Sequence, residues 1–272
     1  MKTIMVHINA DSGQDARLAA ALALVRAVEG HLLCVQVINV SRYVIAEPYV
    51  GMTALGPVYD VLQKENEADR VRIEARLNTE GVSWDWRYLD GGDAETLVRE
   101  SRLADVVVMS LDQPQHHGSE VVHPLPLVAD VAIHARTPVL ALPEVCSPFN
   151  PEGVAMVAWN GSAEGAHAMR FAVPLLKAAA AVHIVATDET GTLYPATLAV
   201  TYLAREGITA TVSTCGQNGA DPKVALPQAA LALSASYVVM GAYGHTRFRE
   251  AVLGGVTRHM LRHSAVPLLL AH

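Results

Sequence analysis

The residues best suited to binding chemistry are two pairs of glycines near the end of the chain. Gly241 and Gly244 come directly after the apolar run YVVM, and Gly254 and Gly255 follow after nine further residues. Glycine lets another molecule approach the backbone closely. If a helix begins near Val256, its first backbone amides point to one place and form an anion site. This spacing therefore predicts a phosphate-binding turn, in which the first pair leaves room for a sugar.

A second interpretation of the same glycines is that they serve only tight turns. The stretch is neither a P-loop nor a G-x-G-x-x-G dinucleotide motif, because it lacks the lysine and the glycine spacing that these motifs require. Its position after an apolar strand favours a ligand, since open α/β sheets bind ligands at strand ends. His245 and Arg247 would neutralise phosphate charge there, or else form a charged surface loop with Glu250.

The composition excludes several classes of protein. The formal net charge of −7, without a strongly basic block, argues against a nucleic-acid partner. With 51% hydrophobic residues, the chain can build a large core. The three cysteines are too far apart for a zinc site or a disulfide framework, so we expect buried, reduced thiols. The N-terminal apolar run is too short for a signal peptide and no stretch is suited to span a membrane, so we expect a soluble cytoplasmic protein.

The elements that must position the glycines belong to a module that occurs twice in the sequence. Each copy starts with an apolar strand, small polar residues, an amphipathic run and a second apolar strand, and each ends with a VVM strand and one more apolar run. The proline-rich segment 143–153 separates the copies, which predicts a first domain over residues 1–146 and a second over 151–272. The matching segments are 3–38 and 154–187, 104–113 and 235–244, and 136–143 and 264–272.

Each copy reads as five strands alternating with four helices. The strands are too uniformly apolar to have one face in water, which is typical of a parallel sheet covered by helices on both sides. The sequence therefore predicts an α/β fold with two tandem, open, doubly wound and mostly parallel five-stranded sheets. Asp93 and Asp221 are expected to cap helix N-termini, with Pro222 at the first helical position.

The two copies differ in the connection that follows the second strand. The connection 39–66 of the first copy is much longer than its counterpart 188–197 and contains prolines, glycines and tyrosines. It is either a lid or subunit contact, or a passive surface loop.

Two other groups of side chains have alternative interpretations. Trp84 and Trp86 point to the same face of an expected strand, which favours core or interface packing over stacking on a ligand. A dense group of potential metal ligands occurs later, but adjacent histidines on a loop cannot easily share one ion, so solvated side chains are favoured. This group consists of Asp112, His116, His117, Glu120 and His123.

The segment VVMGAYGHTRFREAVLGGVTRHML, with VPLLL after it and VAWNGS opening the same half, resembles the universal stress protein (UspA) family. The doubled module is similar to the tandem form of that family. Its nucleotide-binding members carry the pattern G-x-x-G-(nine)-G-Ser/Thr, which Gly241, Gly244 and Gly254 match. The resemblance implies an adenine nucleotide alpha hydrolase-like fold and a stress-response binding or signalling module that holds ATP or another adenine nucleotide, with Mg²⁺.

The resemblance also implies roles for single residues of the second half. Gly241 would lie beside the ribose, and adenine would lie against the ends of the first two strands. Two positions depart from the pattern, because Gly255 stands where binders carry serine and Asn160 where they carry aspartate. The first half lacks the glycine pattern and is expected to be structural. The expected nucleotide-binding residues are Ala158, Asn160, Val185, Ala186, Met240, Gly241, Gly244, His245, Arg247, Gly254, Gly255, Val256 and Thr257.

Partners and activity follow from the same resemblance. Family members commonly pair through their final strands, which here implies pairing of 137–142 with 266–271 inside one chain, with a homodimer as a further assembly. A protein partner that responds to the nucleotide is expected, but neither a nucleic acid nor a membrane. We find no convincing set of nucleophile, base and acid, so the chain is not expected to be an enzyme, and slow ATP hydrolysis is a weaker alternative. The rival hypothesis is a nucleotide-independent interaction module whose glycines only make turns.

Overall fold

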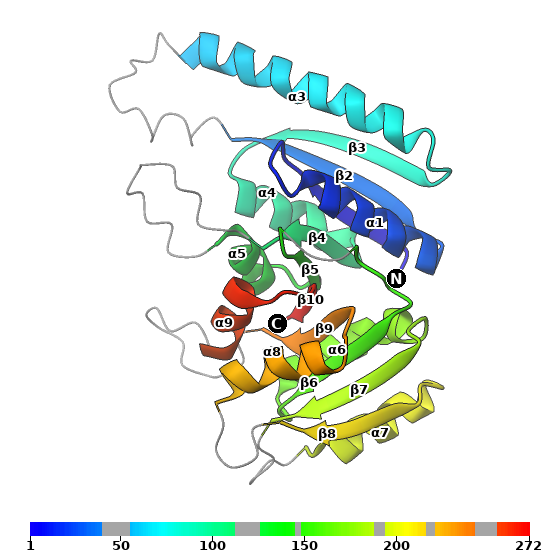
Figure 1. Ribbon diagram of the computed structural model, residues 1–272. Coiled ribbons are helices and arrows are strands. Elements are labelled where there is room, and N and C mark those ends of the chain that lie inside the picture. Colours follow the sequence, from blue (N-terminus) through cyan, green and yellow to red (C-terminus); the bar gives the residue numbers. More distant parts are fainter. Residues whose placement is uncertain (40–54, 112–125, 145–147, 188–193, 216–220, 243–254) are drawn as a thin grey trace.

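A computed structural model describes seven stretches of the chain (Figure 1). They are residues 1–39, 55–111, 126–144, 148–187, 194–215, 221–242 and 255–272. The group of Asp112, His116, His117, Glu120 and His123 therefore lies outside the described residues, and so does most of the connection 39–66.

Within the described residues, the first half alternates five strands with four helices, as the sequence predicts. We call this half the N-terminal module. Its elements are β1 (Thr3–Ile8), α1 (Gln14–Val28), β2 (His31–Ile38), α3 (Leu55–Leu77), β3 (Ser83–Asp90), α4 (Asp93–Glu100), β4 (Val106–Ser110), α5 (Leu127–His134) and β5 (Val139–Leu142), with a short 3-10 turn at Ser101–Leu103 after α4.

The second half repeats the pattern, and we call it the C-terminal module. Its elements are β6 (Val154–Trp159), α6 (Ala163–Leu176), β7 (Ala181–Ala186), α7 (Ala196–Arg205), β8 (Ala210–Thr214), α8 (Pro222–Ala232), β9 (Tyr237–Gly241), α9 (Gly255–His263) and β10 (Leu268–Ala271). Val256 thus lies in a helix, α9, whose described part starts at Gly255.

The two five-stranded sheets join into one ten-stranded sheet. Its order is β3-β2-β1-β4-β5-β10-β9-β6-β7-β8, and neighbours are parallel within each module. At the seam, β5 and β10 pair antiparallel, with Leu269 opposite Leu140. The predicted pairing of 137–142 with 266–271 is therefore confirmed within the chain, and the predicted pair of sheets is continuous through it.

Helices cover both faces of the sheet, as a doubly wound fold requires. The buried residues of α1, α3, α6 and α7 share one core, and those of α4, α5, α8 and α9 share the other. Figure 1 shows α5 and α9 beside each other over the seam strands. Each core runs through both modules, because the strands at the seam contribute side chains to both.

Three local predictions have different outcomes. Asp221 caps α8 by accepting a hydrogen bond from the Lys223 amide at 2.9 Å, and Pro222 is the first helical residue, as predicted. The cap predicted at Asp93 is wrong, because the backbone is still extended at Gly92 and Asp93 is already helical. The expectation of one long connection over 39–66 is also corrected, because residues from Leu55 onward form α3.

The side chains of two predicted groups lie inside the fold. Trp84 and Trp86 are half-buried against the core shared by α1 and α3, which confirms that they pack in the interior. Cys34 is buried, and burial together with the nearby Glu74 raises the pKa of its thiol to about 12, so it stays protonated. Within the seven stretches, no helix combines the length and the apolar character needed to cross a membrane.

The seam gives a prediction about stability. Leu269 is 1% exposed in the strand that joins the two modules, so Leu269→Ala should lower the free energy of unfolding by about 2–5 kcal/mol through lost burial and a cavity. Leu103→Ala is the matched control, because Leu103 is 89% exposed and should change stability by less than about 0.5 kcal/mol. Urea unfolding followed by circular dichroism measures both, and equal effects would contradict the prediction.

Candidate ligand site at the switch points of the two modules

The two modules offer equivalent places for a ligand. In an open α/β sheet, ligands bind beyond the carboxyl ends of the strands, at the point where the strand order reverses. This point lies between β1 and β4 in the N-terminal module and between β6 and β9 in the C-terminal module. The registers pair Ile4 with Val106 and Ala155 with Tyr237. When the two modules are aligned through these pairs, Arg17 of the N-terminal module is equivalent to Ala168 of the C-terminal module. Ser110 is likewise equivalent to Gly241.

A tight turn connects β6 to α6 at the C-terminal switch point. The side-chain oxygen of Asn160 accepts a hydrogen bond from the Ser162 amide at 3.1 Å, and Gly161 has a left-handed φ of 73°. The Ser162 hydroxyl accepts a hydrogen bond from the Gly165 amide at 3.1 Å and so caps α6. The amide side chain of Asn160 is therefore part of the turn itself, a role that needs no negative charge.

Gly241, the last residue of β9, packs against the first turn of α6. A methyl group placed on Gly241 would lie 2.5 Å from the Gly165 nitrogen and 2.7 Å from the Glu164 carbonyl carbon. Both are backbone atoms, so any side chain here would push the strand and the helix apart. The structure thus gives Gly241 a packing role, and its predicted contact with a ribose stays a prediction.

The start of α9 lies close to the ammonium group of Lys223. A methyl group on Gly255 would lie 2.7 Å from Cε and 3.1 Å from Nζ of Lys223, which comes from the first turn of α8. The carboxylate of Asp221 is 3.8 Å from the same Nζ. A cation is thus held beside the helix end at which backbone amides point outward. Thr257, the third residue of α9, is buried.

The remaining predicted residues fall into three groups. Ala158 pairs with Val185 in the sheet register, and both approach the carboxyl edge of β6 and β7 together with the buried Ala186. Met240 is buried near the end of β9, and Val256 is half-buried at the start of α9. The third group of predicted residues, Gly244, His245, Arg247 and Gly254, lies outside the described residues.

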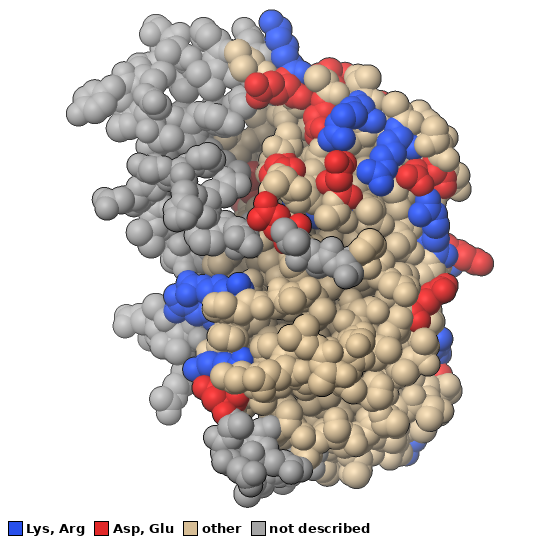
Figure 2. All heavy atoms as spheres, viewed as in Figure 1, with Lys and Arg blue, Asp and Glu red and all other residues tan. Residues whose placement is uncertain are grey.

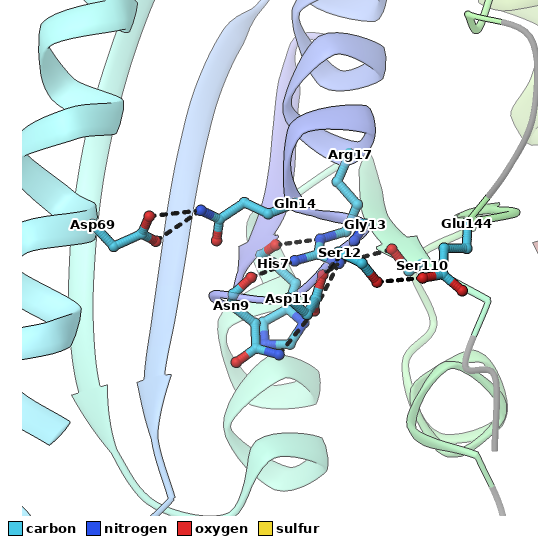
Figure 3. Close-up of polar contacts among 10 residues, drawn as sticks. All are labelled: His7, Asn9, Asp11, Ser12, Gly13, Gln14, Arg17, Asp69, Ser110 and Glu144. Carbon is cyan, nitrogen blue, oxygen red and sulfur yellow. Dashed lines mark hydrogen bonds and ion pairs between the residues drawn. The ribbon is translucent and has the colours of Figure 1, made fainter. Parts of the chain in front are cut away.

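At the N-terminal switch point, the equivalent space holds a buried guanidinium (Figure 3). Arg17 is 1% exposed. Its Nε donates to the carbonyl of His7 at 3.0 Å, and one terminal nitrogen donates to the carbonyl of Asn9 at 2.8 Å. The other terminal nitrogen donates to the Asp11 carboxylate at 2.7 and 3.0 Å and to the Ser110 hydroxyl at 2.7 Å. The side chain therefore spans the gap between β1 and β4.

Two of the residues that shape these sites were missed by the sequence reasoning. Arg17 lies on the same face of α1 as the buried Ala21 and Leu24, and a lone arginine on an apolar helix face was the available signal. Lys223 follows the predicted cap Asp221 and Pro222 in the sequence, and no role was predicted for it. Its approach to Gly255 depends on α8 packing beside α9, which no local pattern reveals.

Charged side chains are unevenly distributed between the modules. On the face shown in Figure 2, Lys, Arg, Asp and Glu gather over the upper part, where the N-terminal module lies, and much of the lower part is uncharged. The ion pairs of α3 contribute to this pattern, since Arg70, Arg72 and Arg76 each pair with a carboxylate.

Comparisons with known proteins agree with this architecture. A model of the universal stress protein family matches residues 154–272. A universal stress protein from Archaeoglobus fulgidus DSM 4304 has a similar structure, with a TM-score of 0.74 and 16% identity over 99% of this chain and 97% of that one. A functionally unknown protein from Pseudomonas aeruginosa PAO1 aligns with a TM-score of 0.59 and 16% identity over 100% of this chain and 92% of that one. A comparison with curated proteins found no match.

The carboxyl group of Asp11 connects stability to pH. Burial raises its pKa, but hydrogen bonding and charge from Arg17, with hydrogen bonds from Asn9 and Gly13, outweigh burial and hold the pKa below the ordinary value of 3.8. At pH values between the folded pKa of Asp11 and its ordinary pKa of 3.8, the unfolded chain therefore binds more protons than the folded chain. The resulting stability is fully present above the ordinary pKa and is lost as the pH falls through the folded pKa.

We expect Asp11→Asn to lower the free energy of unfolding at neutral pH by about 3 kcal/mol, because it leaves the Arg17 guanidinium buried without a counter-charge. The difference from the unaltered protein should shrink as the pH falls below 3.8, since Asp11 then becomes neutral as well. Urea unfolding of both proteins across this pH range measures the effect. A difference that stays constant with pH would contradict the assignment.

Proposed function

We propose that this chain is a universal stress protein, since a model of that family matches its residues 154–272, and that its C-terminal domain, residues 151–272, binds an adenine nucleotide such as ATP. The proposed site lies beyond the carboxyl ends of β6 and β9, at the start of α9. The chain would act in the cytoplasm as a stress-response binding module rather than as an enzyme.

The observation that carries the proposal is the position of Lys223 beside the start of α9. The positive end of a helix dipole repels a neighbouring ammonium group, so this contact is unfavourable by itself. An anion between the helix amides and the ammonium would turn the repulsion into attraction on both sides. A phosphate group has the charge and the acceptor oxygens for this position, and Thr257, the third residue of the same helix, carries a hydroxyl group.

The strand ends supply a suitable wall for the nucleoside. Ala158 is half-buried at the carboxyl edge, beside the backbone of the buried Val185 and Ala186, and a base could pack and form hydrogen bonds there. Mg²⁺ would arrive on the nucleotide, because it prefers phosphate oxygens and water as ligands. In this proposal, the predicted contacts of Gly244 and Gly254 with the phosphates would make the surface around 244–254 depend on the nucleotide. A protein partner would recognise that surface on this protein, whether the protein is a single chain or a homodimer.

Lys223→Gln tests the phosphate contact. We expect the variant to bind ATP about 10-fold more weakly, the loss typical of one charge-assisted hydrogen bond at a solvent-accessible site. Lys177→Gln is the matched control, because Lys177 is similarly exposed but pairs with Glu206 beyond the opposite end of α6. Calorimetric titration of nucleotide-stripped protein with ATP, with and without Mg²⁺, provides the affinities.

Each other outcome points to a different function. Equal ATP affinities of the two variants would show that Lys223 does not contact the nucleotide. Absence of ATP binding by the unaltered protein would overturn the proposal and favour the nucleotide-independent interaction module. Turnover of bound ATP with Mg²⁺ would instead indicate a hydrolase that uses the same site.

A further inference from the structure

We propose that the switch point of the N-terminal module is filled by its own side chain, so that Arg17 acts as a built-in ligand and closes this module to nucleotides. If the C-terminal module binds a nucleotide as proposed above, the chain then binds one nucleotide and not two. The filling of the N-terminal site by Arg17 does not depend on that proposed function.

The first argument is the completeness of the cage around the guanidinium. All three of its nitrogens donate hydrogen bonds, and the acceptors come from the end of β1, from the turn that follows it and from the end of β4. Four acceptor groups in a fixed arrangement match the planar fork of an arginine, which a lysine cannot reproduce. Figure 3 shows the side chain surrounded by these groups.

The second argument is the lack of room for another molecule. A methyl group on Gly13 would lie 2.5 Å from the Ser110 hydroxyl oxygen and 3.2 Å from a terminal nitrogen of Arg17. The backbone of the turn is therefore packed directly onto the ion pair. The C-terminal module has Ala168 in place of Arg17 and Gly241 in place of Ser110, so neither a long side chain nor a hydroxyl occupies those positions.

The third argument is the charge of the surroundings. The Asp11 carboxylate accepts the Gly13 amide at 2.9 Å and so takes the place of an anion at the start of α1. Ser12 donates to the Glu144 carboxylate, and Gln14 donates to the Asp69 carboxylate at 2.8 Å. Phosphate oxygens would meet carboxylates and carbonyl oxygens here and would be repelled. The cage therefore selects a planar cation.

Nuclear magnetic resonance of the unaltered protein, labelled with ¹⁵N-arginine, tests the cage directly. The Nε–H and terminal N–H protons of Arg17 should exchange with water at least about 10-fold more slowly than those of the exposed Arg87, because each bonded proton must first be released. Arg17→Lys identifies the signals. Millimolar ATP should leave them unchanged, and fast exchange or a shift on adding ATP would overturn the proposal.

Chemical rescue provides a second, independent test. Arg17→Ala should lower the melting temperature by about 10 °C, and millimolar guanidinium should recover part of that loss in a saturable way, at constant ionic strength. Arg87→Ala is the control, because it removes an exposed guanidinium that pairs with Glu100 and should gain nothing from guanidinium. If Arg17→Ala folds and guanidinium has no more effect on it than on Arg87→Ala, the cage is not a cation site.

The two proposals fail in different ways. Calorimetry with ATP should give one nucleotide for each chain, and two would overturn the closure of the N-terminal module. Absence of any ATP binding would overturn the proposed function of the C-terminal module. The slow exchange of Arg17 and the rescue by guanidinium would remain, since neither readout involves a nucleotide.

Discussion

The antiparallel pairing of β5 with β10 is the contact on which the rest of the molecule depends. Both strands are short and every residue in them is buried. If either module stood alone, its final strand would expose an apolar edge with unpaired backbone groups, which is a template for aggregation. The pairing of β5 with β10 leaves neither strand with an exposed edge, and each hydrophobic core continues across the seam. The near-symmetry of the chain, with Leu140 facing its counterpart Leu269, follows from this single contact.

Within this shared frame, the two modules treat the same geometric position in opposite ways. Both have a reversal of strand order, a turn after the first strand and a helix that starts beside it. One fills the space with an arginine and balances it with a carboxylate, whereas the other has alanine and glycine at those positions. Duplication gives two crevices, and only a few side chains decide whether such a crevice is part of the core or is left for a ligand.

The elements were predictable from the sequence because their signals are local. The uniformly apolar strands, the repeat and the cap at Asp221 can each be read from a few neighbouring residues. The packing of Gly241 on α6, the approach of Lys223 to α9 and the cage around Arg17 join segments that are far apart in the chain. A glycine that leaves room for a sugar and a glycine that leaves room for a helix look the same in sequence, so the role of Gly241 was not predictable.

The twist of the continuous sheet has a geometric consequence for recognition. Antiparallel strands at the seam run in opposite directions, yet right-handed twist accumulates over ten strands. In Figure 1, β2 and β7 consequently both run toward the same side of the molecule. A protein docking on that side would meet both modules at once. If the C-terminal module binds the proposed nucleotide, that protein would meet one module whose switch point is held by an internal ion pair and another whose switch point holds a ligand.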